Sequence, residues 1–132
     1  MISPIFFSLY IDPLLLALKK SMLECHINNV YMLVLSYADD ITIMCPSIRG
    51  LNRMIRIYSN FADSNYIIFN SKKTMCIKFG EPHKDREKCM LNGQPLTWAD
   101  NVRHLGNYVN CTVTDTIKCN IRSLCLLVML IN

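Results

Sequence analysis

Two adjacent carboxylates, Asp39 and Asp40, are the residues whose type and spacing most clearly permit chemistry. They stand between two aliphatic segments, residues 30–35 and 41–45. Carboxylate oxygens at a tight turn are the hard ligands that Mg²⁺ prefers, and ions held in this way support phosphoryl transfer. An Asp-Asp pair also suits a turn that has no further role, and on spacing alone that interpretation is favoured.

The segments on either side of the pair predict two strands joined by a turn over residues 36–40, because both are rich in aliphatic and β-branched residues. Neither segment alternates between apolar and polar residues. This pattern is typical of strands covered on both faces. The sequence therefore predicts an antiparallel hairpin in the centre of a sheet, with the acids at its tip.

Helices are expected before and after this hairpin. Ser3-Pro4 and Asp12-Pro13 each resemble an N-cap followed by proline, so residues 4–20 form either two helices that meet at Pro13 or one helix kinked there. Ser47 predicts a helix from about residue 48 to residue 62. One face of that helix carries three arginines, which are more often solvated than bound to phosphate: Arg49, Arg53 and Arg56.

The second half of the chain predicts mainly strands. Residues 74–79 alternate as a half-buried strand does, and Asn92-Gly93 predicts a hairpin turn between residues 89–91 and 96–98. Residues 102–109 are expected to be extended, with Gly106 as a bulge, and residues 117–131 to be helical. The fold class is therefore α+β, with helices packed on one face of an antiparallel sheet.

Length, charge and cysteine content indicate the size of the domain and its cellular environment, but they do not identify the function. The 132 residues suffice for one domain, and a net charge of +4 is compatible with a phosphate-rich partner as well as with many enzymes. The seven cysteines include no C-x-x-C pair, which favours reduced thiols in an intracellular protein, nuclear or cytoplasmic. The longest apolar stretches are too short to span a membrane.

Four blocks of the sequence resemble reverse transcriptases. Residues 36–40 match the Y-A-D-D catalytic turn, and residues 3–14 resemble the S-P-x-L-F-x-x-Y-x-x-P-L helix. Residues 70–74 resemble the N-x-x-K-T segment, and residues 102–106 resemble the Y-L-G loop that grips the primer. The blocks occur in family order. The likeness is closest to enzymes of retrotransposons without long terminal repeats.

The resemblance implies roles for individual residues. Asp39 corresponds to the metal ligand for Mg²⁺ or Mn²⁺, and Asp40 to a neighbour that binds the metal less directly. Tyr37 and Ala38 would lie at the primer terminus. Lys73 would act as a general acid on the departing pyrophosphate, although a solvated turn lysine is an equally good interpretation.

The primer grip implied by the resemblance comprises His104, Leu105 and Gly106, with His104 standing where the family usually has an aromatic residue. The implied partners are an RNA template, a DNA primer and deoxynucleotides. Residues 1–115 would form a partial palm, and residues 116–132 the start of a thumb-like helix or a truncated tail.

One departure from the family pattern concerns the first acidic motif, which would precede residue 3 and has no counterpart here. The fingers are missing as well. Because the missing strand would pair beside the Asp-Asp hairpin, we expect an open sheet edge there and no polymerisation by the chain alone. The alternatives are a noncatalytic relic that keeps the palm fold to bind nucleic acid or a partner, and a generic α+β protein in which the acids only form a turn.

Overall fold

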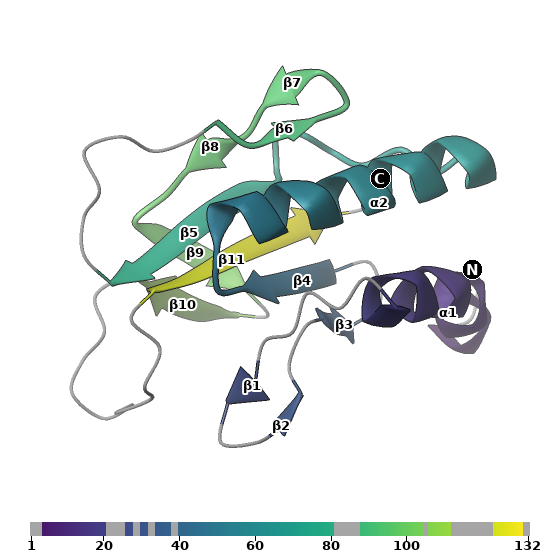
Figure 1. The fold of residues 1–132 in the computed structure, drawn as a ribbon, viewed down its shortest axis with the longest axis horizontal. Coiled ribbons are helices and arrows are strands. Elements are labelled where there is room, and N and C mark those ends of the chain that lie inside the picture. Colours follow the sequence, from purple (N-terminus) through teal and green to yellow (C-terminus); the bar gives the residue numbers. More distant parts are fainter. Residues whose placement is uncertain are drawn as a thin grey trace.

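The computed structural model describes residues 4–20, 26–27, 30–31, 34–37, 40–80, 88–104, 106–111 and 123–130. Figure 1 shows two helices and a central sheet formed by these segments. The presence of both helices and a mainly antiparallel sheet confirms the expected α+β class. In chain order the elements are α1 (Pro4–Lys20), β1 (His26–Ile27), β2 (Val30–Tyr31), β3 (Val34–Tyr37), β4 (Asp40–Cys45), α2 (Ile48–Asn65), β5 (Met75–Gly80), β6 (Met90–Leu91), β7 (Gln94–Pro95), β8 (Thr97–Trp98), β9 (Asn101–His104), β10 (Asn107–Asn110) and β11 (Ser123–Leu130).

The first helix runs through Pro13 without interruption, so the two-helix interpretation is wrong and the continuous one is confirmed. It ends at Lys19 and Lys20, where positive side chains suit the negative end of the helix dipole. Among residues 9–20, the part of α1 whose side chains the structure describes, the buried residues are Ile11, Leu14 and Leu18, which recur at helical spacing.

The second helix begins where the sequence predicts. Ser47 has extended dihedral angles, and its Oγ accepts a hydrogen bond of 3.1 Å from the Gly50 N–H, as an N-cap does. The helix ends at Tyr66, a left-handed residue with φ 56° whose N–H donates to the Ala62 carbonyl. It is thus about one turn longer than expected.

Five strands form the central sheet, in the order β3-β4-β11-β5-β8. All neighbours are antiparallel except β5 and β8. Strands β3 and β4 pair directly, with Tyr37 opposite Asp40. The first arm of this hairpin is shorter than expected, because residues 30–31 belong to a separate two-stranded sheet with β1.

Strand β11 overturns two expectations. Residues 123–130 form a strand between β4 and β5 and not a helix. The physical reason is that an unbroken apolar run suits a strand covered on both faces, and its local pattern cannot be told from that of a buried helix. Because β11 pairs with β4 from Asp40 to Cys45, the β4 side of the hairpin is not open, whereas β3 is an edge strand among the strands that the structure describes.

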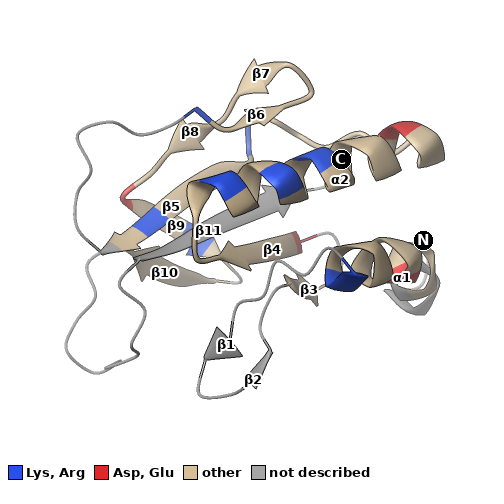
Figure 2. Cartoon of the chain, in the orientation of Figure 1, with Lys and Arg blue, Asp and Glu red and all other residues tan. Residues whose placement is uncertain are grey.

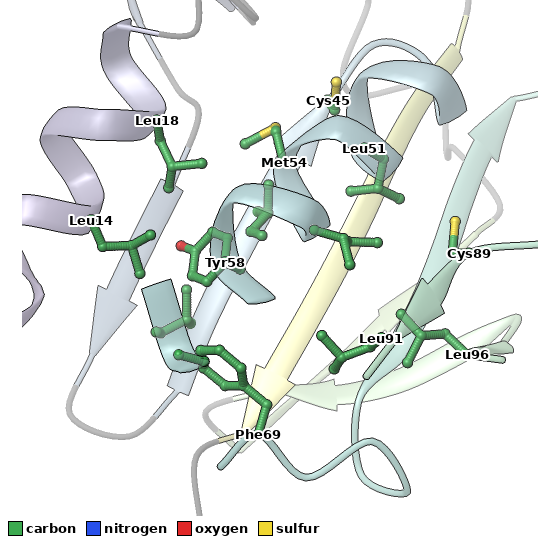
Figure 3. Packing of buried hydrophobic residues seen from close by; sticks show 14 of the residues in the cluster. Leu14, Leu18, Cys45, Leu51, Met54, Tyr58, Phe69, Cys89, Leu91 and Leu96 are labelled. Carbon is green, nitrogen blue, oxygen red and sulfur yellow. The ribbon is translucent and has the colours of Figure 1, made fainter. Parts of the chain in front are cut away.

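The sheet has an apolar core on each face, and the two cores differ in size. On the face covered by α1 and α2, which we call the helix face, Ile41, Ile43 and Cys45 of β4 belong to one core with residues of both helices. Figure 3 shows this core, with Cys45 and side chains of α1 and α2 labelled. On the opposite face, which we call the hairpin face, Met44 packs with Ile77 and Val102. Every residue of β4 from Ile41 to Cys45 is buried, which confirms that this strand is covered on both sides.

Two short hairpins complete the described part. Strands β6 and β7 pair around Asn92 and Gly93, whose φ angles of 51° and 74° fit the predicted turn. The second arm is β7 and not residues 96–98 as expected, because β8 pairs with β5 in the central sheet. Strands β9 and β10 pair around a turn that contains Gly106, at φ 81°. Gly106 is therefore a turn residue and not a bulge.

Four cysteines with described side chains are outside any disulfide, in agreement with the expected reduced thiols: Cys45, Cys76, Cys89 and Cys111. Three of them are buried in the core of the helix face. Burial raises the pKa of the Cys45 thiol, and hydrogen bonds with Ser47 offset part of this rise. Strand β5 also differs from its half-buried prediction, since Cys76 on one face and Ile77 on the other are both fully buried.

Candidate functional site

The Asp-Asp pair falls at the connection between β3 and β4. Asp40 is the first residue of β4 and is half-buried, while Ala38 and Asp39 lie outside the described residues. Tyr37, the last residue of β3, pairs with Asp40 and leaves 69% of its side chain exposed. An exposed aromatic ring therefore stands beside the carboxylate at the tip of the hairpin.

Alternation along β4 decides which face Asp40 shares. Since Ile41 and Ile43 belong to the helix face, Asp40 and Thr42 lie on the hairpin face. Thr42 is only 2% exposed, and its hydroxyl forms a hydrogen bond of 3.1 Å with Nε2 of His104. This bond satisfies the buried hydroxyl and ties the end of β9 to the strand that carries Asp40.

The predicted N-x-x-K-T segment is a hydrogen-bonded turn. Asn70 Oδ1 accepts from the N–H groups of Lys72 and Lys73, each at 3.2 Å. The Asn70 carbonyl accepts from the Thr74 N–H at 3.0 Å and from the Thr74 hydroxyl at 2.8 Å. Thr74 is fully buried, whereas Lys73 is exposed. The asparagine and threonine thus anchor a turn that presents the lysine to solvent.

Strand register places this turn at the same end of the sheet as Asp40. Val128 of β11 pairs with Thr42 on one side and with Met75 on the other. Asp40 lies two residues before Thr42, and Lys73 lies two residues before Met75. Strands β4 and β5 run in the same direction, because both are antiparallel to β11. Only β11 separates the two strands, which are about 10 Å apart at the usual strand spacing.

The turn between β9 and β10 approaches the same end from the hairpin face, because His104 contacts Thr42. Gly106 is exposed in that turn, and Leu105 lies outside the described residues. Three predicted blocks that are far apart in the sequence, around Asp40, Lys73 and His104, therefore meet at one end of the sheet. Figure 1 shows this end at the start of β4 and β5.

Chemically, this end combines a carboxylate, an exposed phenol, an exposed lysine and an imidazole. Among the residues that the structure describes, no three potential metal ligands are close enough to form a complete site. Asp40 nevertheless offers oxygen, the donor that Mg²⁺ takes, and Mg²⁺ usually keeps several waters beside one or two carboxylates. The described donors therefore fit this metal in kind.

A family model described as reverse transcriptase (RNA-dependent DNA polymerase) matches residues 1–109. The chain belongs to the reverse transcriptase family. No curated protein and no solved structure matches it. Reverse transcriptases use a nucleic-acid template and primer with nucleotide substrates, and generally require divalent metals. Within the described part of this reverse transcriptase chain, no helix is long and apolar enough to cross a membrane.

Sequence reasoning missed the residues that support the backbone of this candidate site. Thr42 looked like one more β-branched strand residue, although it is the buried partner of His104. Asn70 and Thr74 were noted only as parts of a pattern, and their spacing carried the signal, because an Asx turn followed by a buried threonine fixes residues 71–73.

Proposed function

We propose that this chain is part of an RNA-directed DNA polymerase from a retrotransposon without long terminal repeats. The observation that supports this most is the convergence of three family-like blocks at one end of the sheet. The parent enzyme would add deoxynucleotides to the 3′-hydroxyl of a DNA primer on an RNA template. Intracellular action, nuclear or cytoplasmic, is part of the same proposal.

In this proposal Asp39 and Asp40 hold Mg²⁺, with Mn²⁺ as a substitute. The bound metal supplies charge neutralisation at the reacting phosphate. Asp40 stands at the entrance to a fully buried strand, so the backbone that carries its carboxylate is held firmly from behind.

The primer terminus would lie against Tyr37 and Ala38 and under the turn of His104, Leu105 and Gly106. Tyr37 offers an exposed ring on which a base can stack. The bond between Thr42 and His104 holds the turn at a fixed height above β4. Gly106 has no side chain to obstruct a closely approaching backbone, and its left-handed conformation suits glycine.

Lys73 would donate a proton to the departing pyrophosphate. Its exposed ammonium group stands on a turn anchored by Asn70 and Thr74, so its backbone position is defined while its side chain can reach outward. A positive charge there also favours the polyanionic nucleotide.

We further propose that the chain does not polymerise by itself. Leu130 of β11 pairs with Asp40, and residues 123–130 contain no acid, so the neighbouring strand adds no carboxylate to the site. The same observation favours the second candidate, a noncatalytic protein that keeps the fold to bind nucleic acid or a partner. The two candidates differ in what happens when an upstream acidic strand is supplied.

Primer extension on an RNA template tests the proposal with two proteins, the chain itself and a version extended upstream by the acidic strand and fingers of a related element. We expect extension only by the longer protein, and its loss in Asp39→Ala. Asp63→Ala, at the far end of α2, is the matched control and should retain activity. Activity in neither protein would favour the noncatalytic candidate, and activity in the short chain would contradict the need for another acid.

A further inference from the structure

The outer surface of α2 carries a row of positive side chains that the proposed polymerase site does not use. Arg49, Arg53 and Arg56 are all exposed and recur at spacings of four and three residues, so they line one face of the helix. Figure 2 shows these basic positions along the first half of α2, with the only acid of the helix, Asp63, near its end.

The row continues onto the sheet. Lys78 of β5 lies on the helix face, because Cys76 two residues before it belongs to that core. Register aligns Lys78 with Cys125 and Cys45, the residue from which the chain turns into α2. Lys78 is therefore near the helix end that carries Arg49. We call Lys78, Arg49, Arg53 and Arg56 the basic row.

The arrangement works against helix stability. Arg49 stands in the first turn of α2, which contains no acid, and a positive charge is unfavourable at that end of the helix dipole. Arg49 and Arg53, and Arg53 and Arg56, are like-charge neighbours on the same face. Among the described residues, none of these arginines has an ion-pair partner. A row that opposes local stability without internal compensation is typical of a binding surface.

We propose that the basic row binds the phosphate backbone of a nucleic-acid strand, on the side of the sheet opposite Asp40 and His104. The guanidinium group pairs with phosphate through two parallel hydrogen bonds, which explains arginine at all three helix positions. The helical rise separates successive arginines by about 6 Å and 4.5 Å, comparable to the spacing of one to two phosphates along a strand. The choice of nucleic acid over an acidic protein rests on the proposed function.

Because the basic row and the proposed polymerase site lie on opposite faces of the sheet, the basic row would be a second attachment point for the nucleic acid. It would contact phosphates and not bases. Binding should therefore be independent of sequence and should weaken as salt rises. Loss of the three arginines should reduce the salt dependence, since each phosphate contact to a single strand contributes about 0.7 to the slope of log K against log salt concentration.

The test measures fluorescence anisotropy of labelled oligouridylate and oligothymidylate, each of about 20 nucleotides, which is long enough to span the basic row. The full chain is compared with Arg49→Gln/Arg53→Gln/Arg56→Gln. The matched control is Lys19→Gln/Lys20→Gln/Lys88→Gln, which removes three exposed charges elsewhere and also lowers the net charge from +4 to +1. Circular dichroism verifies that each variant folds, and Arg53→Gln alone serves if the triple variant does not.

We expect the arginine variant to bind both oligonucleotides about tenfold more weakly, with a slope lower by about 2, and the lysine variant to bind nearly as the parent does. Equal weakening in both variants would overturn the proposal, because net charge alone would then account for binding. An arginine-dependent complex with polyglutamate that outcompetes both oligonucleotides would overturn it in favour of an acidic protein partner. The anisotropy assay measures binding and requires no catalysis. Its result can therefore be interpreted even if the primer-extension test of the proposed function fails.

Discussion

Both faces of β4 are buried, but they differ in whether their buried polar groups have hydrogen-bond partners. On the helix face, Ile41 and Ile43 pack into a large apolar core in which the Tyr58 hydroxyl has no hydrogen-bond partner. On the hairpin face, the Thr42 hydroxyl is paired with His104, and Asp40 lies half-buried at the end of the same row. A buried hydroxyl is thus left unpaired on the helix face and is paired on the hairpin face.

This difference indicates how one strand can be held by packing on one face and carry the candidate site on the other. The helix face provides the packing that fixes the position of β4, because α1 and α2 both contribute fully buried side chains to it. The hairpin face has a smaller core and can hold polar groups near its end. Changes on the helix face should therefore affect folding, and changes on the hairpin face should affect the site.

The largest expected effect compares the same truncation on the two faces. Ile43 and Ile77 are both fully buried strand residues, one on each face. We expect Ile43→Ala to reduce the free energy of unfolding by about 4 kcal/mol and Ile77→Ala by about 2 kcal/mol, because a short hairpin can shift to fill a cavity more easily than two helices can. Urea unfolding followed by circular dichroism measures both, and equal losses would remove the distinction between the faces.

The next effect is a gain in stability. Burial without a hydrogen bond holds the pKa of Tyr58 far above its usual value and leaves its hydroxyl desolvated. Tyr58→Phe keeps the ring, which meets Phe69 edge-to-face at 5.9 Å, and removes only the oxygen. We expect the free energy of unfolding to rise by about 1 kcal/mol. Destabilisation in the same urea assay would mean that the hydroxyl has a use on the helix face.

The counterpart on the hairpin face should have the opposite sign. Thr42→Val removes a hydroxyl that is satisfied by His104, so we expect a loss of up to about 1 kcal/mol. Thr42→Ser, which keeps the hydroxyl, is the control for the contact with His104. In two-dimensional NMR, the His104 ring signals should shift in the valine variant and remain close to the parent in the serine variant. Unchanged signals in both would argue against the bond.

The sequence predicted well those elements whose signal is local. Ser47 and the spacing of apolar residues defined α2, and the unbroken apolar run of residues 41–45 correctly indicated a strand buried on both sides. The run of residues 124–131 has the same character but was interpreted as a helix. A short apolar run can form a central strand only if a strand is present on each side of it. Here those strands are β4 and β5, which come from distant parts of the chain, so the local sequence does not reveal them.

For the candidate site, the sequence predicted the residues but not their arrangement in space. The family-like blocks identified Asp40, Lys73 and His104, yet only strand register and the Thr42 bond bring them to one end of the sheet. No local pattern contains that information, because β11 determines the spacing between β4 and β5. The roles given to all the site residues stay predictions, and Asp39, Ala38 and Leu105 in addition lie outside the described part.

Paramagnetic broadening by Mn²⁺ tests the central claim most directly, because it locates a weak metal site without requiring catalysis. Substoichiometric Mn²⁺ is added to the isotope-labelled chain, and backbone amide signals are followed with the Asp39→Ala variant as comparison. We predict selective broadening around Tyr37, Asp40 and the turn of Lys73, absent from α2 and lost in the variant. Broadening centred on Asp63 of α2, or unchanged by Asp39→Ala, would contradict the assignment of this end of the sheet as the metal-binding site.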